Sequence, residues 1–327
     1  MSEVTTVTQV AQIGVETTEG TAVAASKYLP SIGIELDPDL TINPFRPTGN
    51  KFTTIHQIGK DYCVAPITGQ PTYDEMNYLF NSLLQKVNGV QQSATTAYKR
   101  TYGPSSTDED TVDTFTVETG SSVRARKAAG LRVVSLGMKG SRNGIELSGQ
   151  AIGRAISTGI TMTSSPTAIP QVPILPKHVD IYVDSASGSL GTTKLTRSFE
   201  WEWMLGNRAA PFWPVNSALP SYGGFAEGAN DATLKLKLEG DSTGDGYLAD
   251  ARAGTTRFVR IKATSDVLAG TAIYYSLQMD FAVQVKSVGK PGDHENIWCT
   301  DYEFDIVHDA TWGKALAFEL ISKTNAL

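Results

Sequence analysis

Apolar and polar residues alternate along much of the chain. In residues 198–205, Trp201 and Trp203 alternate with Glu200 and Glu202. A period of two places successive side chains on opposite faces of a strand. The same period recurs in residues 233–239, 274–286 and 301–307. Because one face is apolar and the other polar, these segments are predicted to be half-buried antiparallel strands of a mainly β protein.

One helix is predicted, over residues 72–88. Thr72 and Glu75 have the spacing of a capping box, in which each side chain satisfies a backbone N–H group of the first turn. The apolar residues of this segment recur at helical spacing: Met76, Leu79, Phe80, Leu83, Leu84 and Val87. Such a regular stripe is the usual core face of a helix, so we expect it to pack on the sheet rather than to form a groove for a partner.

The order of the predicted elements repeats. A strand runs into Pro-Phe-x-Pro in each half of the chain, and the second copy stands 167 positions after the first. The same offset carries Ile34 to Trp201 and Leu36 to Trp203. The repeated residues are Pro44, Phe45 and Pro47 in the first half and Pro211, Phe212 and Pro214 in the second. A strand, a helix and a pair of strands follow each motif, the second helix being a weaker candidate over residues 241–254. This shared order indicates an internal duplication.

Chain length agrees with two domains, since 327 residues exceed the usual size of a single core of roughly 150 residues. Residues 1–25 are polar and rich in threonine, and we expect them to form an extended arm. We place the first strand-rich domain at residues 26–157 and the second at residues 179–327. The Pro, Ser and Thr-rich residues 158–178 are predicted to be the linker between them.

Composition excludes several classes of protein. A hydrophobic content of 40% is typical of a folded protein rather than a disordered chain. A net charge of −6, without any run of basic residues, disfavours tight binding to nucleic acid. The N-terminus lacks a signal-peptide pattern and no segment is apolar enough to span a membrane, so a soluble, unsecreted protein is expected. Cys63 and Cys299 are too few and too far apart for a disulfide framework, which favours a reducing compartment.

The strongest enzyme-like motif is the G-x-S-x-G pattern of residues 240–244, which would make Ser242 a nucleophile. That elbow belongs to parallel sheets alternating with helices, whereas these strands follow one another with few helices. No cofactor fingerprint is present, and residues 241–252 lack the ligand pattern of an EF-hand. The four histidines have no metal-ligand spacing: His56, His178, His294 and His308. We therefore predict no catalytic, cofactor or metal site.

The N-terminal segment resembles that of tail tube (major tail) proteins of long, non-contractile-tailed bacteriophages, in which a G-x-E-x-T-x-G-T-like arm runs into the first strand. The matching residues are Gly14, Glu16, Thr17, Thr18, Gly20, Thr21 and Val23. The resemblance continues through residues 60–88 and, more faintly, through residues 199–215. The shorter members of that family have one sandwich-like domain, whereas this chain looks like two in tandem.

The resemblance implies a structural virion protein whose subunits close into rings that stack into a hollow tube for genome passage. It implies two tail-tube-like β-sandwich or barrel domains, each with a flanking helix, and an extended N-terminal arm. Its partners would be other copies of itself and the tape-measure, tail-terminator and tail-tip proteins. DNA would pass through the lumen without specific binding, and the protein would reside in the host cytoplasm during assembly and in the phage tail afterwards.

Three hypotheses extend this interpretation. If single-domain relatives form six-membered rings, a tandem duplication predicts trimers with pseudo-sixfold symmetry. Acidic residues would line the bore and repel DNA. Residues 1–25 would lie across a neighbouring ring. Two alternatives stay open: a tail-tip or carbohydrate-binding β-sandwich using Trp201, Trp203 and Trp213, and, more distantly, a serine esterase through Ser242.

Overall fold

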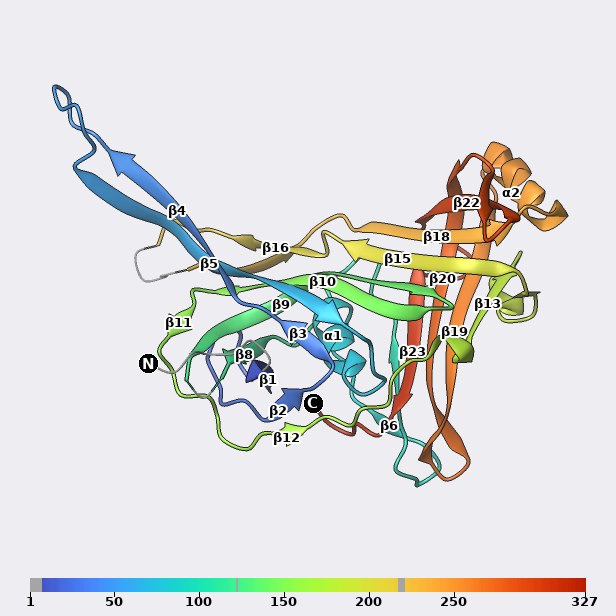
Figure 1. The fold of residues 1–327 in the computed structure, drawn as a ribbon, viewed down its shortest axis with the longest axis horizontal. Helices are drawn as coiled ribbons and strands as arrows, with labels where there is room; N and C mark the ends of the chain where they lie inside the picture. Colours follow the sequence, from blue (N-terminus) through green and yellow to red (C-terminus); the bar gives the residue numbers. More distant parts are fainter. Residues whose placement is uncertain (1–7, 122, 217–220) are drawn as a thin grey trace.

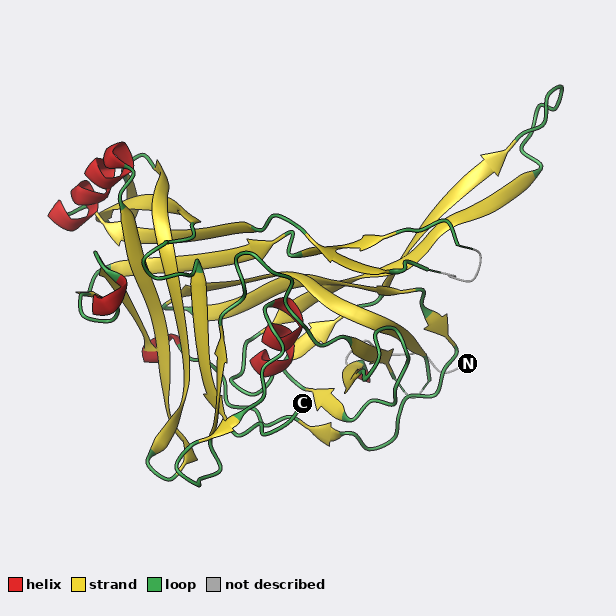
Figure 2. Ribbon diagram, turned by 180° about the vertical axis from the view of Figure 1, so that it is seen from behind, coloured by secondary structure: helices red, strands yellow, loops and turns green. Residues whose placement is uncertain are grey.

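The computed structural model describes residues 8–121, 123–216 and 221–327. The fold is mainly β, as predicted, with 54% strand and 8% helix (Figures 1 and 2). The strands up to residue 168 are β1 (Val10–Val15), β2 (Lys27–Leu29), β3 (Ile32–Ile34), β4 (Asp37–Phe45), β5 (Ile55–Gly69), β6 (Val90–Gln91), β7 (Tyr98–Tyr102), β8 (Phe115–Gly120), β9 (Ala125–Ser141), β10 (Gly144–Arg154), β11 (Ser157–Thr158) and β12 (Thr167–Ala168). Those that follow are β13 (Val179–Asp184), β14 (Lys194–Leu195), β15 (Ser198–Gly206), β16 (Ala209–Phe212), β17 (Gly224–Glu227), β18 (Asp231–Glu239), β19 (Thr256–Gly270), β20 (Ile273–Val288), β21 (Gly292–His294), β22 (Ile297–Ile306) and β23 (Leu316–Ser322). The α-helices of the described residues are α1 (Met76–Leu83) and α2 (Ser242–Ala253), and two 3₁₀ turns are η2 (Pro176–His178) and η3 (Ser187–Ser189).

A central antiparallel sheet runs through both halves of the chain. Its strand order is β4–β5–β10–β9–β15–β18–β22–β20, and β3 extends β4 along the same edge of β5. The join between the halves is the pairing of β9 with β15, in which Trp203 lies opposite Met138. Backbone hydrogen bonds therefore connect the halves directly.

The sheet folds over at both ends to enclose a core. The first part of β20 leaves β22 and pairs instead with β19 and β23, and β23 pairs with β7 from the first half. The start of β9 pairs with β8, which continues through β1 to β2. Figure 1 shows β19, β20 and β23 crossing the direction of β15 and β18. The buried apolar side chains of both halves form one contiguous cluster, so the expected tandem arrangement of two separate domains is not confirmed.

The predicted helix corresponds to α1, and it is more deeply buried than its apolar stripe indicates. The N–H of Glu75 donates to the Thr72 hydroxyl over 3.3 Å, which is one half of the predicted capping box. The Glu75 carboxylate accepts the Thr72 hydroxyl over 2.6 Å and the N–H of Ser31 over 2.9 Å, in place of the N–H of Thr72. All eight residues of α1 are buried, Asn77 among them. The helix ends at Leu83, so Val87 lies beyond it, half-buried against the core.

Three buried polar residues around α1, namely Asp74, Asn77 and Arg100, find partners at the other end of the chain. Asn77 donates to the Ser322 hydroxyl over 3.0 Å, and Thr324 donates to Asp74 over 2.8 Å. Arg100 donates to the Asn77 side-chain oxygen over 3.1 Å and to the Thr324 carbonyl over 2.7 Å. The C-terminal segment is therefore fastened to a helix of the first half.

The extended N-terminal arm is not confirmed for the residues that the structure describes. β1 pairs with both β2 and β8 inside the same chain. Glu16 is only 6% exposed, and its carboxylate accepts hydrogen bonds from the hydroxyls of Thr114 and Thr116 and from the N–H groups of Gly20 and Gly130 at 2.7–2.9 Å. The part of the predicted inter-ring arm that falls on residues 1–7 lies outside the described residues.

The predicted linker is an ordered strap. β12 pairs in parallel with β2, and Ile169 and Ile174 are buried. The N–H of Ile174 donates to the Pro71 carbonyl over 3.0 Å, and the N–H of Tyr73 donates to the Val172 carbonyl over 3.1 Å. Residues 158–178 are therefore extended, as their prolines indicate, but packed against the first half.

Candidate functional site

One face of the central sheet is polar across both halves of the chain. On six successive strands, from β10 to β20, one residue of each forms a continuous row: Glu146, Lys139, Glu202, Lys235, Glu303 and Ser287. None of the six is buried. Negative and positive side chains alternate along the row, so each lysine has an acidic neighbour on both adjoining strands. Opposite charges placed directly across a ladder stabilise it modestly.

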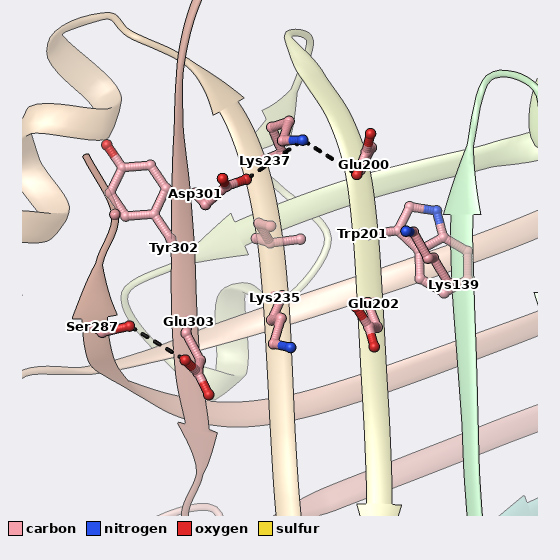
Figure 3. Close-up of a pocket in the computed structure, with 12 residues that line it drawn as sticks. Lys139, Glu200, Trp201, Glu202, Lys235, Lys237, Ser287, Asp301, Tyr302 and Glu303 are labelled. Carbon is pink, nitrogen blue, oxygen red and sulfur yellow. Dashed lines mark hydrogen bonds and ion pairs between the residues drawn. The ribbon is translucent and has the colours of Figure 1, made fainter. Parts of the chain in front are cut away.

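Alternation within the strands explains why this face is charged. In β18, Lys235 and Lys237 point to the polar face, whereas Leu234, Leu236 and Leu238 are buried on the other. Figure 3 shows the polar face around a shallow pocket between β9, β15, β18 and β22. Lys237 bridges Glu200 at 3.4 Å and Asp301 at 3.8 Å.

Ion pairs also continue to the far edge of this face. Lys286 on β20 bridges Glu303 at 3.4 Å and Asp305 at 3.3 Å, and its hydrogen bonds to these carboxylates raise its pKa. The row and its ion-paired neighbours comprise Glu146, Glu200, Glu202, Asp301, Glu303 and Asp305, with Lys139, Lys235, Lys237 and Lys286, and Glu239 continues the same face at the end of β18. The face is therefore mildly acidic and closely charge-balanced.

The tryptophans of β15 lie on the opposite, buried side of the sheet. Trp203 is 1% exposed and its ring centroid lies 5.4 Å from that of Phe318. Trp201 is also buried, over Gly140, where an added Cβ would lie 2.4 Å from the indole ring. Neither ring is exposed for stacking on a sugar.

The second prominent feature is the hairpin β4–β5, which projects beyond the sheet (Figure 1). Every residue from 40 to 60 is exposed except Pro47, which is half-buried. Exposed large apolar residues gather here: Leu40, Ile42, Phe45, Phe52, Ile55 and Ile58. An isolated two-stranded ribbon has no core of its own. This concentration of apolar surface is typical of a segment that another protein surface covers.

A second hairpin, β16–β17, extends in the same direction and packs against the base of the first. Trp213 contacts Tyr62 with ring centroids 5.4 Å apart, and the Lys60 ammonium lies 5.2 Å from the Trp213 ring. The Ser221 hydroxyl donates to the Asp61 carbonyl over 2.7 Å. The two hairpins therefore form a joined projection at one end of the sheet.

The repeated Pro-Phe motif occupies corresponding positions in these hairpins. Pro44 and Phe45 end β4, opposite His56 and Ile55, and Pro211 and Phe212 end β16, opposite Phe225 and Gly224. Pro47 and Pro214 follow in the two connecting loops.

Strand pairing corrects the register of the repeat deduced from sequence. We equate Gly69, at the end of β5, with Gly240, just after β18. The strand pairings then place Leu36 in the position of Trp201, whereas the sequence alignment placed Leu36 in the position of Trp203, two residues further on. The break between β15 and β16 at Asn207 and Arg208 accounts for these two residues.

Both strand pairings carry one extra residue, at different places. In the β9–β10 pairing the register shifts between Gln150 and Ala151, and in the β20–β22 pairing it shifts between Val285 and Ser287. Each shift leaves one residue of the longer strand without a direct partner.

Other candidate chemistry is dispersed. Ser242 begins α2, and the preceding strand β18 is antiparallel to both its neighbours, which is not the setting of a nucleophile elbow. Both cysteines are buried, and burial raises the pKa of the Cys63 thiol to about 12. Within the described residues, no cluster of His, Cys, Asp and Glu could hold a metal ion, and neither α-helix is long and apolar enough to cross a membrane.

Comparison with known proteins assigns this chain to no family. A scan against protein-family models found no match, and a search of curated proteins also found none.

Two features of the structure, the β4–β5 hairpin and the charged row, were not predicted from the sequence. The hairpin could have been predicted, because residues 40–60 combine six large apolar residues with a loop that contains Pro and Gly, and they include no acidic residue. The second depends on which strands are neighbours, which the sequence does not state.

Proposed function

We propose that this protein is the subunit of a phage tail tube, a structural virion protein that assembles into stacked rings. The observation that carries the proposal is the repeated four-strand unit joined head to tail. The order β3/β4–β5–β10–β9 in the first half is repeated as β15–β18–β22–β20/β21 in the second, and β9 pairs with β15. A unit that joins its own copy through opposite edges can add further copies in the same way.

The outer edges of the joined units support ring formation. Among the described residues, β4 of the first half pairs only with β5, and β21 of the second half pairs only with β22. These edges correspond to the edges of β15 and β9 that meet inside the chain. Repeating that join between copies closes a ring and removes exposed strand edges. Because each chain holds two units, three chains supply six, and the ring is a trimer with pseudo-sixfold symmetry.

The polar face supplies a suitable lining for the tube. The lysines of the face lie beside carboxylates, so few positive charges are free to release counterions from DNA. A mildly acidic, charge-balanced surface lets DNA pass without specific binding. By the resemblance, the tape-measure, tail-terminator and tail-tip proteins are the other partners, the assembled tail is the final location, and catalysis is no part of the function.

Cryo-electron microscopy of the purified protein over a range of concentrations tests the proposal. Hollow tubes with threefold symmetry would support both the tail-tube function and the duplicated unit. Tubes with six full-length chains per ring would keep the function and remove the trimer. Monomers at every concentration, with no ring or tube, would count against the assembly.

A further inference from the structure

The projecting hairpin has a charge opposite to that of the whole protein. Residues 40–60 contain Arg46, Lys51 and Lys60 and no acidic residue, although the net charge of the chain is −6. Arg46 and Lys51 lie in the loop between β4 and β5, beside the exposed Phe45 and Phe52. We call residues 45–55 the hairpin tip. It is both apolar and basic.

The opposite composition occurs at the β21–β22 turn. Residues 291–300 contain two acidic residues, Asp293 and Glu295, and neither Lys nor Arg. The turn also exposes Ile297 and Trp298, the latter by 63%. We call Asp293, Glu295, Ile297 and Trp298 the Trp298 patch.

Trp298 is exposed but held in place. Its carbonyl accepts the N–H of Gly240 over 2.8 Å, and its ring lies so close to Gly240 that an added Cβ would be 2.3 Å from the ring. The glycine therefore makes room for the indole against the end of β18. A fixed, exposed tryptophan flanked by carboxylates is well suited to bind a partner that presents both a cation and an aromatic ring.

The hairpin tip and the Trp298 patch lie at opposite ends of the sheet. β5 begins at the projecting hairpin and ends at Gly69, opposite Leu147 near the start of β10. The same end of the sheet holds the β9–β10 turn, the start of β15, the end of β18 and the start of β22 with Trp298. Figure 1 shows the hairpin at the upper left and β22 at the right.

We propose that the hairpin tip of one copy docks on the Trp298 patch of a second copy in the next ring. The contact rests on the proposed stacking of rings and names the two surfaces that make it. Arg46 and Lys51 meet Asp293 and Glu295, and the apolar side chains of the tip cover Ile297 and Trp298. Because the two surfaces differ and face opposite ways, the contact is head to tail and propagates into an open stack.

Cross-linking between full-length copies tests the contact directly. One copy carries Lys51→Cys and a mass tag, and the other carries Glu295→Cys; both positions are exposed, and the native Cys63 and Cys299 are buried. Under mild oxidation we expect the mixed disulfide dimer to exceed, by about fivefold or more, that formed by the control pair Arg124→Cys and Glu295→Cys. Equal yields from the two pairs would overturn the proposal.

Charge reversal supplies the second test. We expect Arg46→Glu with Lys51→Glu, and separately Asp293→Lys with Glu295→Lys, to reduce stacking of rings about tenfold, and the combined variant to recover most of it. Arg124→Glu with Lys323→Glu makes the same charge change on other exposed residues and should stack normally. Stacking that survives reversal of the tip, or that the combined variant fails to recover, would overturn the contact.

The two proposals fail in different ways. Tubes without the specific cross-link would keep the tail-tube function and remove this contact. A specific cross-link in a protein that forms only open chains of copies, without rings, would keep the contact and remove the tail tube.

Discussion

Lys139 and Glu202 lie directly opposite each other on β9 and β15, at the point where the two halves of the chain become one sheet. Both side chains are on the polar face, and the residues on either side of them, Met138 and Trp203, are buried beneath. One short stretch of pairing therefore builds two surfaces at once. The polar face runs unbroken across the junction, and the core does the same on the other side.

A shared core predicts cooperative unfolding. Since one apolar cluster and the β7–β23 pairing include both halves, we expect a single transition in differential scanning calorimetry, with the calorimetric and van't Hoff enthalpies equal. Two resolved transitions would mean that the halves are energetically separate domains.

Trp203 tests how much the core beneath the junction contributes. Its ring contacts Phe281 and Phe318, both from the second half, and lies opposite Met138 of the first. Trp203→Ala should lower the free energy of unfolding by about 3–5 kcal/mol, because a large buried ring leaves a cavity. Lys139→Ala, on the exposed side of the same junction, should change it by less than about 0.5 kcal/mol. Urea denaturation of the two variants measures the difference, and equal effects would contradict the packing described.

A substitution of Glu16 tests whether the N-terminal segment stabilises the fold of its own subunit or acts as an inter-ring arm. Its carboxylate accepts four hydrogen bonds within the chain, so Glu16→Ala should destabilise the isolated subunit by about 3 kcal/mol or more. Thr17→Ala, at the exposed neighbouring position, is the control and should be nearly neutral. A Glu16→Ala subunit that is as stable as wild type but fails to assemble would favour the arm instead.

Asp74 makes stability depend on pH in a predictable direction. Burial raises the pKa of this carboxyl, against the opposing effect of hydrogen bonds from the Thr324 hydroxyl and the Lys323 N–H. A raised pKa means that the folded state holds the proton more tightly than the unfolded state, in which the pKa is about 3.9. Stability from this group is therefore present at low pH and is lost as pH rises through the folded pKa.

The matched variant Asp74→Asn keeps an acceptor for Thr324 and does not titrate. Denaturant unfolding from pH 4 to pH 8 should show wild type losing stability relative to this variant as pH rises above about 4. Parallel stability profiles for the two proteins would show that Asp74 does not titrate differently in the folded and unfolded states.

The alternation of residues in β15, β18 and β22 sufficed to predict these strands and their buried faces, because period two is a local property. Strand partners are not local, so the junction between Lys139 and Glu202 required the structure. The prediction of an extended arm at residues 1–25 was not confirmed for a different reason. Gln12 is buried because β1 is paired on both sides, and Glu16 is buried because its carboxylate is hydrogen-bonded within the chain. A hydropathy pattern does not reveal the burial of polar residues of this kind. The strap at residues 158–178 likewise packs through only a few residues such as Ile169 and Ile174.

The charged row leads to the last prediction, which concerns DNA. In the wild-type protein every lysine of the row Glu146–Lys139–Glu202–Lys235–Glu303 has acidic neighbours, so we expect no measurable retention of double-stranded DNA. Glu202→Lys with Glu303→Lys creates a run of four adjacent lysines across β9, β15, β18 and β22. The variant should bind DNA at least about tenfold more tightly at 50 mM salt and lose most of that binding by 200 mM, since phosphate contacts release counterions.

Fluorescence anisotropy with labelled duplex DNA measures this binding, and Glu35→Lys with Glu109→Lys is the control, because both residues are exposed and lie outside the row. If the control gains as much affinity as the row variant, net charge alone decides binding and the row has no special part. If only the row variant binds, the alternation of charge across the strands is what keeps DNA from adhering to this face. In assembled tubes the same substitution should then slow DNA passage, which places the polar face on the inside of the tube, whereas unchanged passage would place it elsewhere.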